Sequence, residues 1–202
     1  MKIANVSAKF YLLSALLLLA ACSSDKSGNQ GGVEGAFSSE AIWESSCLDS
    51  DQFGLTMRSR FQINGEAFSR TNQYHSDGSC TDLAVETIEE GSLNRVAATD
   101  GSATGSIDFV YQRIDITPVS KNGLNALNTL SFCGMNNWQV GQMRNVTGRS
   151  GFNCWDQTPR TIRDMYFVNG STLYFGIGSE KQKSGSASRP TAPDESRPWN
   201  IR

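Results

Sequence analysis

The only histidine of the chain stands in a run of residue types that could support nucleophilic catalysis. Tyr74-His75-Ser76-Asp77 brings a base, a hydroxyl group and a carboxylate together in consecutive positions. A working triad needs these groups to converge in space from a rigid scaffold, with hydrogen-bond donors for an oxyanion. Neighbouring residues at the end of a hairpin seldom converge in this way. We therefore interpret the run as a solvated polar turn.

The common sequence templates of catalysis are missing from the chain. It has no G-x-S-x-G nucleophile elbow, no H-E-x-x-H zinc motif, no phosphate-binding loop and no dinucleotide fingerprint. We therefore predict that the protein is not an enzyme and that it uses no cofactor.

Two acidic segments could bind a metal ion, and neither has the pattern of a metal site. Residues 49–54 begin like a calcium loop, but Phe53 stands where a ligand oxygen is needed and Arg60 where a bidentate glutamate is needed. Residues 86–90 contain three glutamates without partners in the sequence. We predict a strand-connecting turn for the first segment, a solvated strand face for the second, and no metal site.

The first 21 residues have the composition of a secretory signal peptide. Two lysines occur among the first nine residues, residues 10–21 are apolar except for Ser14, and Ala20 and Ala21 end the apolar run. A basic start, a short apolar stretch and small residues at the exit are the parts of such a peptide. The apolar stretch is shorter than the roughly 20 residues that a membrane span needs.

The end of this segment, Leu19-Ala20-Ala21-Cys22, resembles the lipobox of bacterial lipoproteins. The resemblance implies that the signal peptide (1–21) is removed and that acyl chains on Cys22 anchor the mature chain to a membrane. Ser23 rather than Asp follows Cys22, which implies the outer membrane of a Gram-negative bacterium. Two or three acyl chains would bind firmly, because each buried methylene contributes roughly 0.8 kcal/mol.

The charge of the mature chain disfavours nucleic acid as a partner. Without Lys2 and Lys9 the chain has 16 basic and 20 acidic residues, a net charge of −4. Nucleic acids and anionic membrane surfaces need basic clusters in a protein that binds them, so neither is expected as the main partner.

The four remaining cysteines predict two disulfides, because an even set of cysteines in an exported chain is typical of a disulfide framework. They are Cys47, Cys80, Cys133 and Cys154. Three connectivities are open, and we favour Cys47–Cys80 with Cys133–Cys154, since neighbours in the sequence close the smaller loops. A zinc site is disfavoured, because the chain has no C-x-x-C pair and a single histidine.

Composition divides the mature chain into a folded domain and two tails. Residues 22–36 contain almost nothing to bury and predict a flexible tether. Residues 179–202 form a tail rich in Pro and Ser, from which Trp199 and Ile201 could dock back. The folded domain is therefore expected over residues 37–178.

Alternating side chains predict a β-hairpin around Asn64-Gly65. In residues 55–63 apolar and polar side chains alternate, as in a half-buried strand. Asn-Gly is a strong hairpin signal, because both residues tolerate positive φ in a type I′ turn. Counting outward across a two-residue loop pairs Ile63 with Glu66, Phe61 with Phe68, Ser59 with Arg70, Met57 with Asn72, and Leu55 with Tyr74.

Similar patterns elsewhere predict an all-β, antiparallel fold. A second hairpin is expected at Asn169-Gly170, and several alternating segments separated by turn residues lie between the two hairpins. Only residues 121–137 could hold a short helix. About 8–10 strands at nearly regular spacing indicate a barrel or, alternatively, a sandwich.

Several phrases of the sequence resemble an uncharacterised bacterial lipoprotein family. They lie at residues 43–47, 74–80, 133–138, 169–176 and 189–191. The order of Trp, Cys and Cys-Gly…Trp is also distantly similar to the domain of the adenomatosis polyposis coli down-regulated protein. That resemblance implies a lipocalin-like barrel that holds lipid, and it implies no catalytic residues. The chain departs from lipocalins in one respect, because Ala41-Ile42 precedes Trp43 in place of Gly-x.

A first hypothesis is that the barrel binds a small apolar or amphipathic ligand in its interior. An eight-stranded barrel has room for one small ligand if side chains do not fill it. The hairpin count places Arg70, Asn72 and Tyr74 on the face of Phe61, so these four are the candidate ligand-binding residues. A buried arginine needs an anionic or carbonyl partner, which a ligand head group would supply. The alternatives are pairing with an internal acid, such as Glu66 or Asp108, or a position at an open rim.

A second hypothesis is a non-enzymatic envelope module that recognises a protein or a glycan through its loops. Trp138, Phe152 and Trp155 lie in the region around Cys133 and Cys154. Exposed aromatic side chains on disulfide-held loops would suit recognition. The alternative for the same residues is that they plug one end of the barrel.

Overall fold

The computed structural model describes residues 41–50, 52–97, 103–151, 154, 160–178 and 188–202. These residues belong to one compact unit. The predicted signal peptide (1–21), tether (22–36) and lipidated Cys22 lie outside them.

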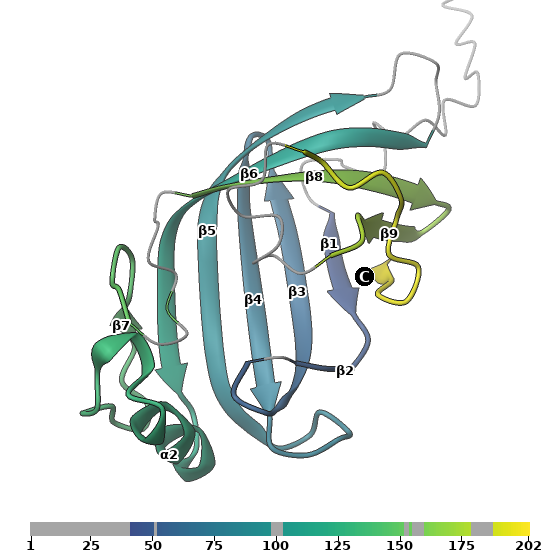
Figure 1. The fold of residues 1–202 in the computed structure, drawn as a ribbon. Helices are drawn as coiled ribbons and strands as arrows, with labels where there is room; N and C mark the ends of the chain where they lie inside the picture. Colours follow the sequence, from purple (N-terminus) through teal and green to yellow (C-terminus); the bar gives the residue numbers. More distant parts are fainter. Residues whose placement is uncertain (1–40, 51, 98–102, 152–153, 155–159, 179–187) are drawn as a thin grey trace, which may run out of the picture. The chain divides into compact units, whose positions relative to one another are not determined.

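Eight antiparallel strands close into a barrel (Figure 1). Around the ring each strand pairs with the next one along the chain, and β10 closes the ring by pairing with both β9 and β1. The eight strands are β1 (Ile42–Ser45), β3 (Thr56–Asn64), β4 (Ala67–His75), β5 (Leu83–Ala97), β6 (Thr104–Pro118), β8 (Arg160–Asn169), β9 (Thr172–Phe175) and β10 (Trp199–Ile201). Two short strands, β2 (Leu48–Asp49) and β7 (Arg144–Asn145), pair with β3 and β6. The predicted antiparallel all-β fold is confirmed, in its barrel form.

The first hairpin forms where it was predicted, but its register differs by two residues. The loop is Gly65-Glu66 rather than Asn64-Gly65, so that Phe61 pairs with Arg70 and Ile63 with Phe68. Gly65 has a φ of 62°, as expected for a type II′ turn with glycine at its first central position. A shift of two residues keeps every side chain on its predicted face, because side chains alternate with a period of two.

The second hairpin repeats this geometry. Asn169 pairs with Thr172 across the loop Gly170-Ser171, and Gly170 has a φ of 60°. Both Asn-Gly pairs therefore mark a real hairpin, with the glycine rather than the asparagine in the left-handed conformation.

The longest strands, β5 and β6, bend so that the sheet can curve into a barrel. Their register shifts between Glu90 and Gly91, which marks a β-bulge. A Cβ atom at Gly91 would overlap the carbonyl oxygen of Val110 on β6. The close approach of the two backbones at this bend therefore requires glycine.

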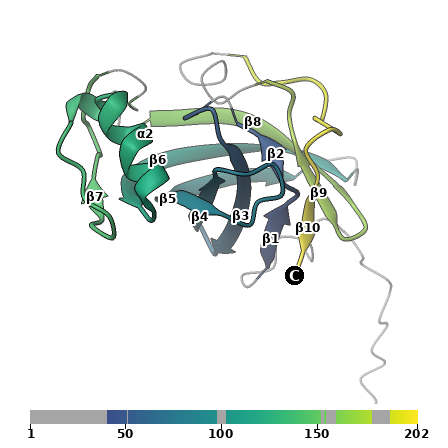
Figure 2. The ribbon, with the colours of Figure 1, turned by 90° about the horizontal axis from the view of Figure 1, so that it is seen from below.

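A short helical segment covers one end of the barrel. Helix α2 (Lys121–Thr129) begins at the cap Ser120, whose side chain accepts a hydrogen bond from Gly123 N, and the 3-10 helix η1 (Phe132–Gly134) follows it. Helix α2 packs against β5 and β6 (Figure 2). The helix expected within residues 121–137 is confirmed.

Both disulfides have the favoured pairing, Cys47–Cys80 and Cys133–Cys154. The first connects the chain between β1 and β2 to the turn after β4. The second ties η1 to the chain before β8. Each bridge closes a loop whose ends lie outside the main ladders of the barrel.

The C-terminal residues are part of the barrel. Trp199 pairs with Ser45 of β1 and with Leu173 of β9, which confirms that this end of the tail docks on the domain. Upstream, the Arg189 guanidinium donates hydrogen bonds to the carbonyl oxygens of Ile107 and Asp164 at 3.0 and 2.9 Å. Strand-forming residues therefore extend beyond residue 178, because the ring needs β10 to pair the edges of β1 and β9.

Within the described residues, no helix is both long and apolar enough to cross a membrane.

Candidate functional site: a polar network inside the barrel

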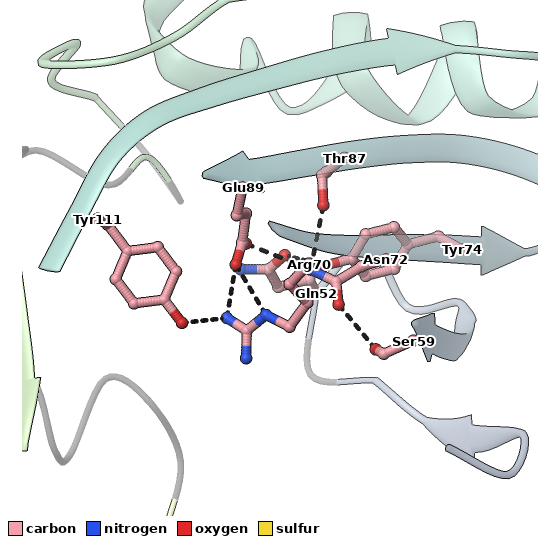
Figure 3. A network of polar contacts seen from close by, with 8 residues as sticks. All are labelled: Gln52, Ser59, Arg70, Asn72, Tyr74, Thr87, Glu89 and Tyr111. Carbon is pink, nitrogen blue, oxygen red and sulfur yellow. Dashed lines mark hydrogen bonds and ion pairs between the residues drawn. The ribbon is translucent and has the colours of Figure 1, made fainter. Parts of the chain in front are cut away.

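The four predicted ligand residues lie on adjacent strands and share the inner face of the barrel. Phe61 comes from β3, and Arg70, Asn72 and Tyr74 come from alternate positions of β4. Phe61, Asn72 and Tyr74 are buried, and the side chain of Arg70 is 16 % exposed. The hairpin count thus placed all four side chains on the correct face. Hydrogen bonds through Glu89 connect Arg70 and Asn72 into one network (Figure 3).

Arg70 forms an ion pair with Glu89, its direct cross-strand partner on β5. Its Nε and Nη2 atoms donate to Glu89 Oε2 at 2.9 and 2.5 Å, and Nη2 also donates to the hydroxyl oxygen of Tyr111 at 2.6 Å. Arg70 therefore does pair with an internal acid. The acid is Glu89, and neither Glu66 nor Asp108 takes that role.

Glu89 corrects the interpretation of residues 86–90 as a solvated strand face. Its side chain is 1 % exposed, whereas that of Glu90 is 50 % exposed. The pattern of β5 could have revealed this difference, because Val85, Thr87 and Glu89 alternate along one face and the first two are also buried.

Asn72 joins the ion pair to a row of hydroxyl groups. It lies between Ser59 of β3 and Thr87 of β5 in the sheet. Ser59 Oγ donates to Asn72 Oδ1 at 2.7 Å, and Asn72 Nδ2 donates to Thr87 Oγ1 at 3.1 Å and to Glu89 Oε1 at 3.2 Å. Both carboxylate oxygens of Glu89 thus accept hydrogen bonds, which offsets the desolvation of a buried charge.

Phe61 and Tyr74 lie in two different apolar clusters on either side of the network. Phe61 packs edge-to-face against Phe109, Phe175 and Trp199, with ring centroids 5.7, 5.7 and 6.2 Å away. Tyr74 belongs to the cluster below α2 and η1, where its hydroxyl group donates to Gln52 Oε1 at 2.7 Å. The interior is therefore apolar at both ends and polar in between.

Arg160, at the start of β8, is a second arginine of the interior that the sequence analysis did not single out. It is buried, and its guanidinium carbon lies 4.8 Å from the centre of the Tyr111 ring. The guanidinium carbon of Arg70 lies 5.4 Å from the same ring. Tyr111 therefore contacts two cations, a favourable arrangement for an aromatic ring. No motif marks Arg160, because only the pairing of β8 with β6 brings it opposite Tyr111.

The run Tyr74-His75-Ser76-Asp77 has no triad geometry. Asp77 accepts hydrogen bonds from the backbone N–H groups of Thr81 and Asp82 at 3.0 and 2.9 Å, and Ser76 donates to Asp82. Hydrogen bonds from Ser79 and Thr81, together with that of Asp82, hold the pKa of Asp77 well below its usual value. The interpretation as a polar turn therefore holds for the segment after His75.

His75 itself is buried rather than solvated. Neither ring nitrogen has a hydrogen-bond partner within the described part of the chain. Desolvation lowers the pKa of His75 from 6.5, and this effect outweighs the opposing charge of Asp77.

Trp138 occupies the end of the barrel rather than its surface. It is buried in the cluster of Tyr74, and the guanidinium carbon of Arg144 lies 5.7 Å from the centre of its ring. Of the two alternatives for this residue, plugging the barrel end is the one found. Phe152 and Trp155 lie outside the described residues.

The arrangement as a whole joins a guanidinium, a phenol, an amide and two hydroxyl groups around one carboxylate, and it can hold a polar group. No protein-family model matches the sequence, and a comparison with curated proteins finds no match either.

Proposed function

We propose that the protein is a lipoprotein of the outer membrane whose barrel binds a small amphipathic ligand, with the ligand's head group against Arg70. Acyl chains on Cys22 would hold it to the membrane, as in the bacterial lipoprotein family that the sequence resembles. A binding role rather than a catalytic one, and a lipid-like ligand rather than a nucleic acid, are parts of this proposal.

The observation that carries the proposal is the asymmetry of the Arg70–Glu89 pair. The Glu89 side chain is 1 % exposed and fully engaged by Arg70 and Asn72, whereas the Arg70 side chain is 16 % exposed. A molecule that enters the barrel therefore meets the cation before the carboxylate. Apolar side chains flank this cation, including Phe61 and Phe68, which suits a molecule with a polar head and an apolar body.

The internal acid limits what the head group can be. Glu89 already balances the charge of Arg70, so the ligand is not required to neutralise an isolated cation. A carboxylate or carbonyl group would instead share the guanidinium with Glu89 and Tyr111, as a further hydrogen-bond acceptor. A cationic head group would gain no such hydrogen bond, because the guanidinium has donors and no acceptor.

Native mass spectrometry of the detergent-purified full chain tests the ligand. Palmitate and the uncharged alcohol hexadecanol are offered at equal concentration to the wild type and to the R70K variant, which keeps the charge but not the forked donor geometry. We expect R70K to lose palmitate binding by roughly tenfold, equivalent to about 1.4 kcal/mol. The matched control is R113K, because the Arg113 side chain is 57 % exposed and pairs with Asp115, outside the Arg70 network.

Equal palmitate binding by wild type and R70K would refute the role of Arg70. Equal binding of palmitate and hexadecanol to the wild type would refute a carboxylate head group. Metabolic labelling with palmitate tests the anchor separately: the wild type should carry the label and the C22S variant should not. The burial of Trp138 removes the support for recognition through that residue, so no second function is proposed.

A further inference from the structure

A tight turn beside helix α2 exposes an unusual share of apolar surface. We call residues 139–143 the tip turn. Six large apolar residues are exposed within the described part of the chain, and three lie at or beside this turn: Val119, Val140 and Met143, at 39, 50 and 51 %. Gly141 N donates to the carbonyl oxygen of Pro118 at 2.8 Å, which brings the turn next to Val119.

Hydrogen bonds with neighbouring residues fix the conformation of the tip turn. Gln142 N donates to the carbonyl oxygen of Gln139 at 3.1 Å, and the Arg144 guanidinium donates to Asn137 Oδ1 and Gln142 Oε1 at 2.6 and 3.2 Å. Arg144 also covers the ring of Trp138, which is buried. The exposed side chains of Val140 and Met143 thus project from a turn whose backbone is fixed by hydrogen bonds.

The segment of the sequence that contains the tip turn carries positive charge only; the neighbouring acid Asp115, which pairs with Asn145 across β6 and β7, is buried. Between Asp115 and Asp156 the chain has three basic residues, Lys121, Arg144 and Arg149, and no acidic residue. The rest of the mature chain has 13 basic and 20 acidic residues, a net charge of −7. Within the described residues, none of these three cations forms an ion pair, whereas Arg70, Arg113, Arg189, Arg197 and Arg202 do.

We propose that the tip turn docks on an anionic lipid bilayer, with Val140 and Met143 at the acyl boundary and Lys121 and Arg144 at the head groups. This inference rests on the lipid anchor of the proposed function. An acyl chain together with a basic surface is an established combination for membrane attachment. The 19 residues from Cys22 to Ala41 reach at most about 60–70 Å when extended, so the anchor permits contact without imposing an orientation.

Charge then selects the orientation of the anchored domain. An anionic surface repels the acidic remainder of the chain and attracts the acid-free segment around the tip turn. The exposed apolar side chains lie within that same segment. Electrostatic attraction and the burial of apolar surface therefore favour the same orientation, with the tip turn toward the bilayer. The net charge of −4 is the sum of this basic segment and the acidic remainder of the mature chain. For that reason the charge of the whole chain disfavoured an anionic surface, although the segment around the tip turn is basic.

A nitroxide label at Q142C in the full, lipidated chain reports on the docking. The four other cysteines of the domain are paired in disulfides and Cys22 is acylated under the proposal, so the new thiol is the single labelling site. The protein is placed in vesicles of phosphatidylcholine with or without phosphatidylglycerol. Accessibility of the label to oxygen, which dissolves in the bilayer, is compared with accessibility to a water-soluble nickel complex.

We expect the Q142C label to shift from nickel access to oxygen access when phosphatidylglycerol is present. A label at S171C, in the exposed β8–β9 turn, should stay accessible to nickel in both vesicles. Adding V140Q and M143Q should return the Q142C label to water. The matched control is I177Q, which removes an equally exposed apolar side chain elsewhere and should leave the shift unchanged.

Two failures are distinguishable. A protein that does not float with either vesicle overturns the lipid anchor and the docking with it. A protein that floats while its Q142C label stays in water overturns the docking alone.

Discussion

Arg70 and Glu89 face each other across β4 and β5, and one carboxylate oxygen of Glu89 accepts both donors of the forked contact from Arg70. The other oxygen accepts from Asn72. Removing a charge from water costs several kcal/mol unless hydrogen bonds replace the lost solvation. Two residues of a single neighbouring strand thus replace part of the solvation that the buried carboxylate loses.

Replacing Arg70 by methionine is expected to lower the free energy of unfolding by about 3–5 kcal/mol, because Glu89 is left as a buried charge without its cation. Adding E89Q should recover part of this loss. Urea denaturation followed by circular dichroism measures both effects. The control R197M removes the surface pair with Asp194, whose side chains are 51 and 24 % exposed, and should cost no more than about 1 kcal/mol. Equal losses for R70M and R197M would show that the barrel interior is solvated.

Replacing Gly91 by alanine is expected to destabilise the bend between β5 and β6. The added Cβ atom would overlap the backbone of Val110, and forced displacements of this kind cost about 1–3 kcal/mol. Gly78 is the matched control, since a Cβ atom there meets nothing within 4 Å and should change stability by less than about 0.5 kcal/mol. Thermal denaturation of the two variants compares them directly, and similar melting temperatures would contradict the close approach.

Replacing Trp199 by alanine is expected to weaken the closure of the barrel at β10. The indole packs against Phe175 and Phe61, with ring centroids 5.9 and 6.2 Å away. The loss should fall below the roughly 3–5 kcal/mol of a fully buried tryptophan, because Trp199 is only partly buried. Amide hydrogen exchange measures the effect strand by strand. Relative to the wild type, the variant should exchange faster, and this acceleration should be larger in β1, β9 and β10 than in β4 and β5. N200A, at an exposed position of the same strand, should leave the exchange pattern unchanged.

Lowering the pH is expected to destabilise the protein through His75. Burial lowers the pKa of His75 in the folded state below its usual 6.5, so the unfolded chain binds the proton more readily. The free energy of unfolding should therefore fall as the pH drops below about 6.5 and level off below the folded pKa. Asp77 does not contribute in this window, because hydrogen bonds hold its pKa below its usual 3.8.

Urea midpoints between about pH 7.5 and 5.5 measure this dependence, with H75Q as the comparison. The readout is the slope of the midpoint against pH, which does not depend on the absolute stability of the variant. We expect the slope to disappear in H75Q. A wild type with a constant midpoint over this range would show that the imidazole is solvated when folded.

Much of the fold could be predicted because it depends on local signals. Alternation in residues 55–63 and the glycines at 65 and 170 act over a few residues, and they place the hairpins and the inner faces of the strands. The disulfide pairs followed from sequence distance for a similar reason, since short loops cost less entropy to close. The same local logic identified Arg70 and Asn72 as interior side chains.

Other features depend on which strands meet, and no local pattern contains that information. The hairpin loop is Gly65-Glu66 rather than Asn64-Gly65, because the register of the β3–β4 ladder must be compatible with that of the adjoining β4–β5 ladder. Arg160 reaches Tyr111 only because β8 pairs with β6. The sequence by itself determined the strands, their faces and the favoured disulfide pairs, whereas the register between β4 and β5 decided the partner of Arg70 and ring closure decided the place of β10. Pairing between distant strands is a property of the closed sheet, in which each edge must find hydrogen-bond partners.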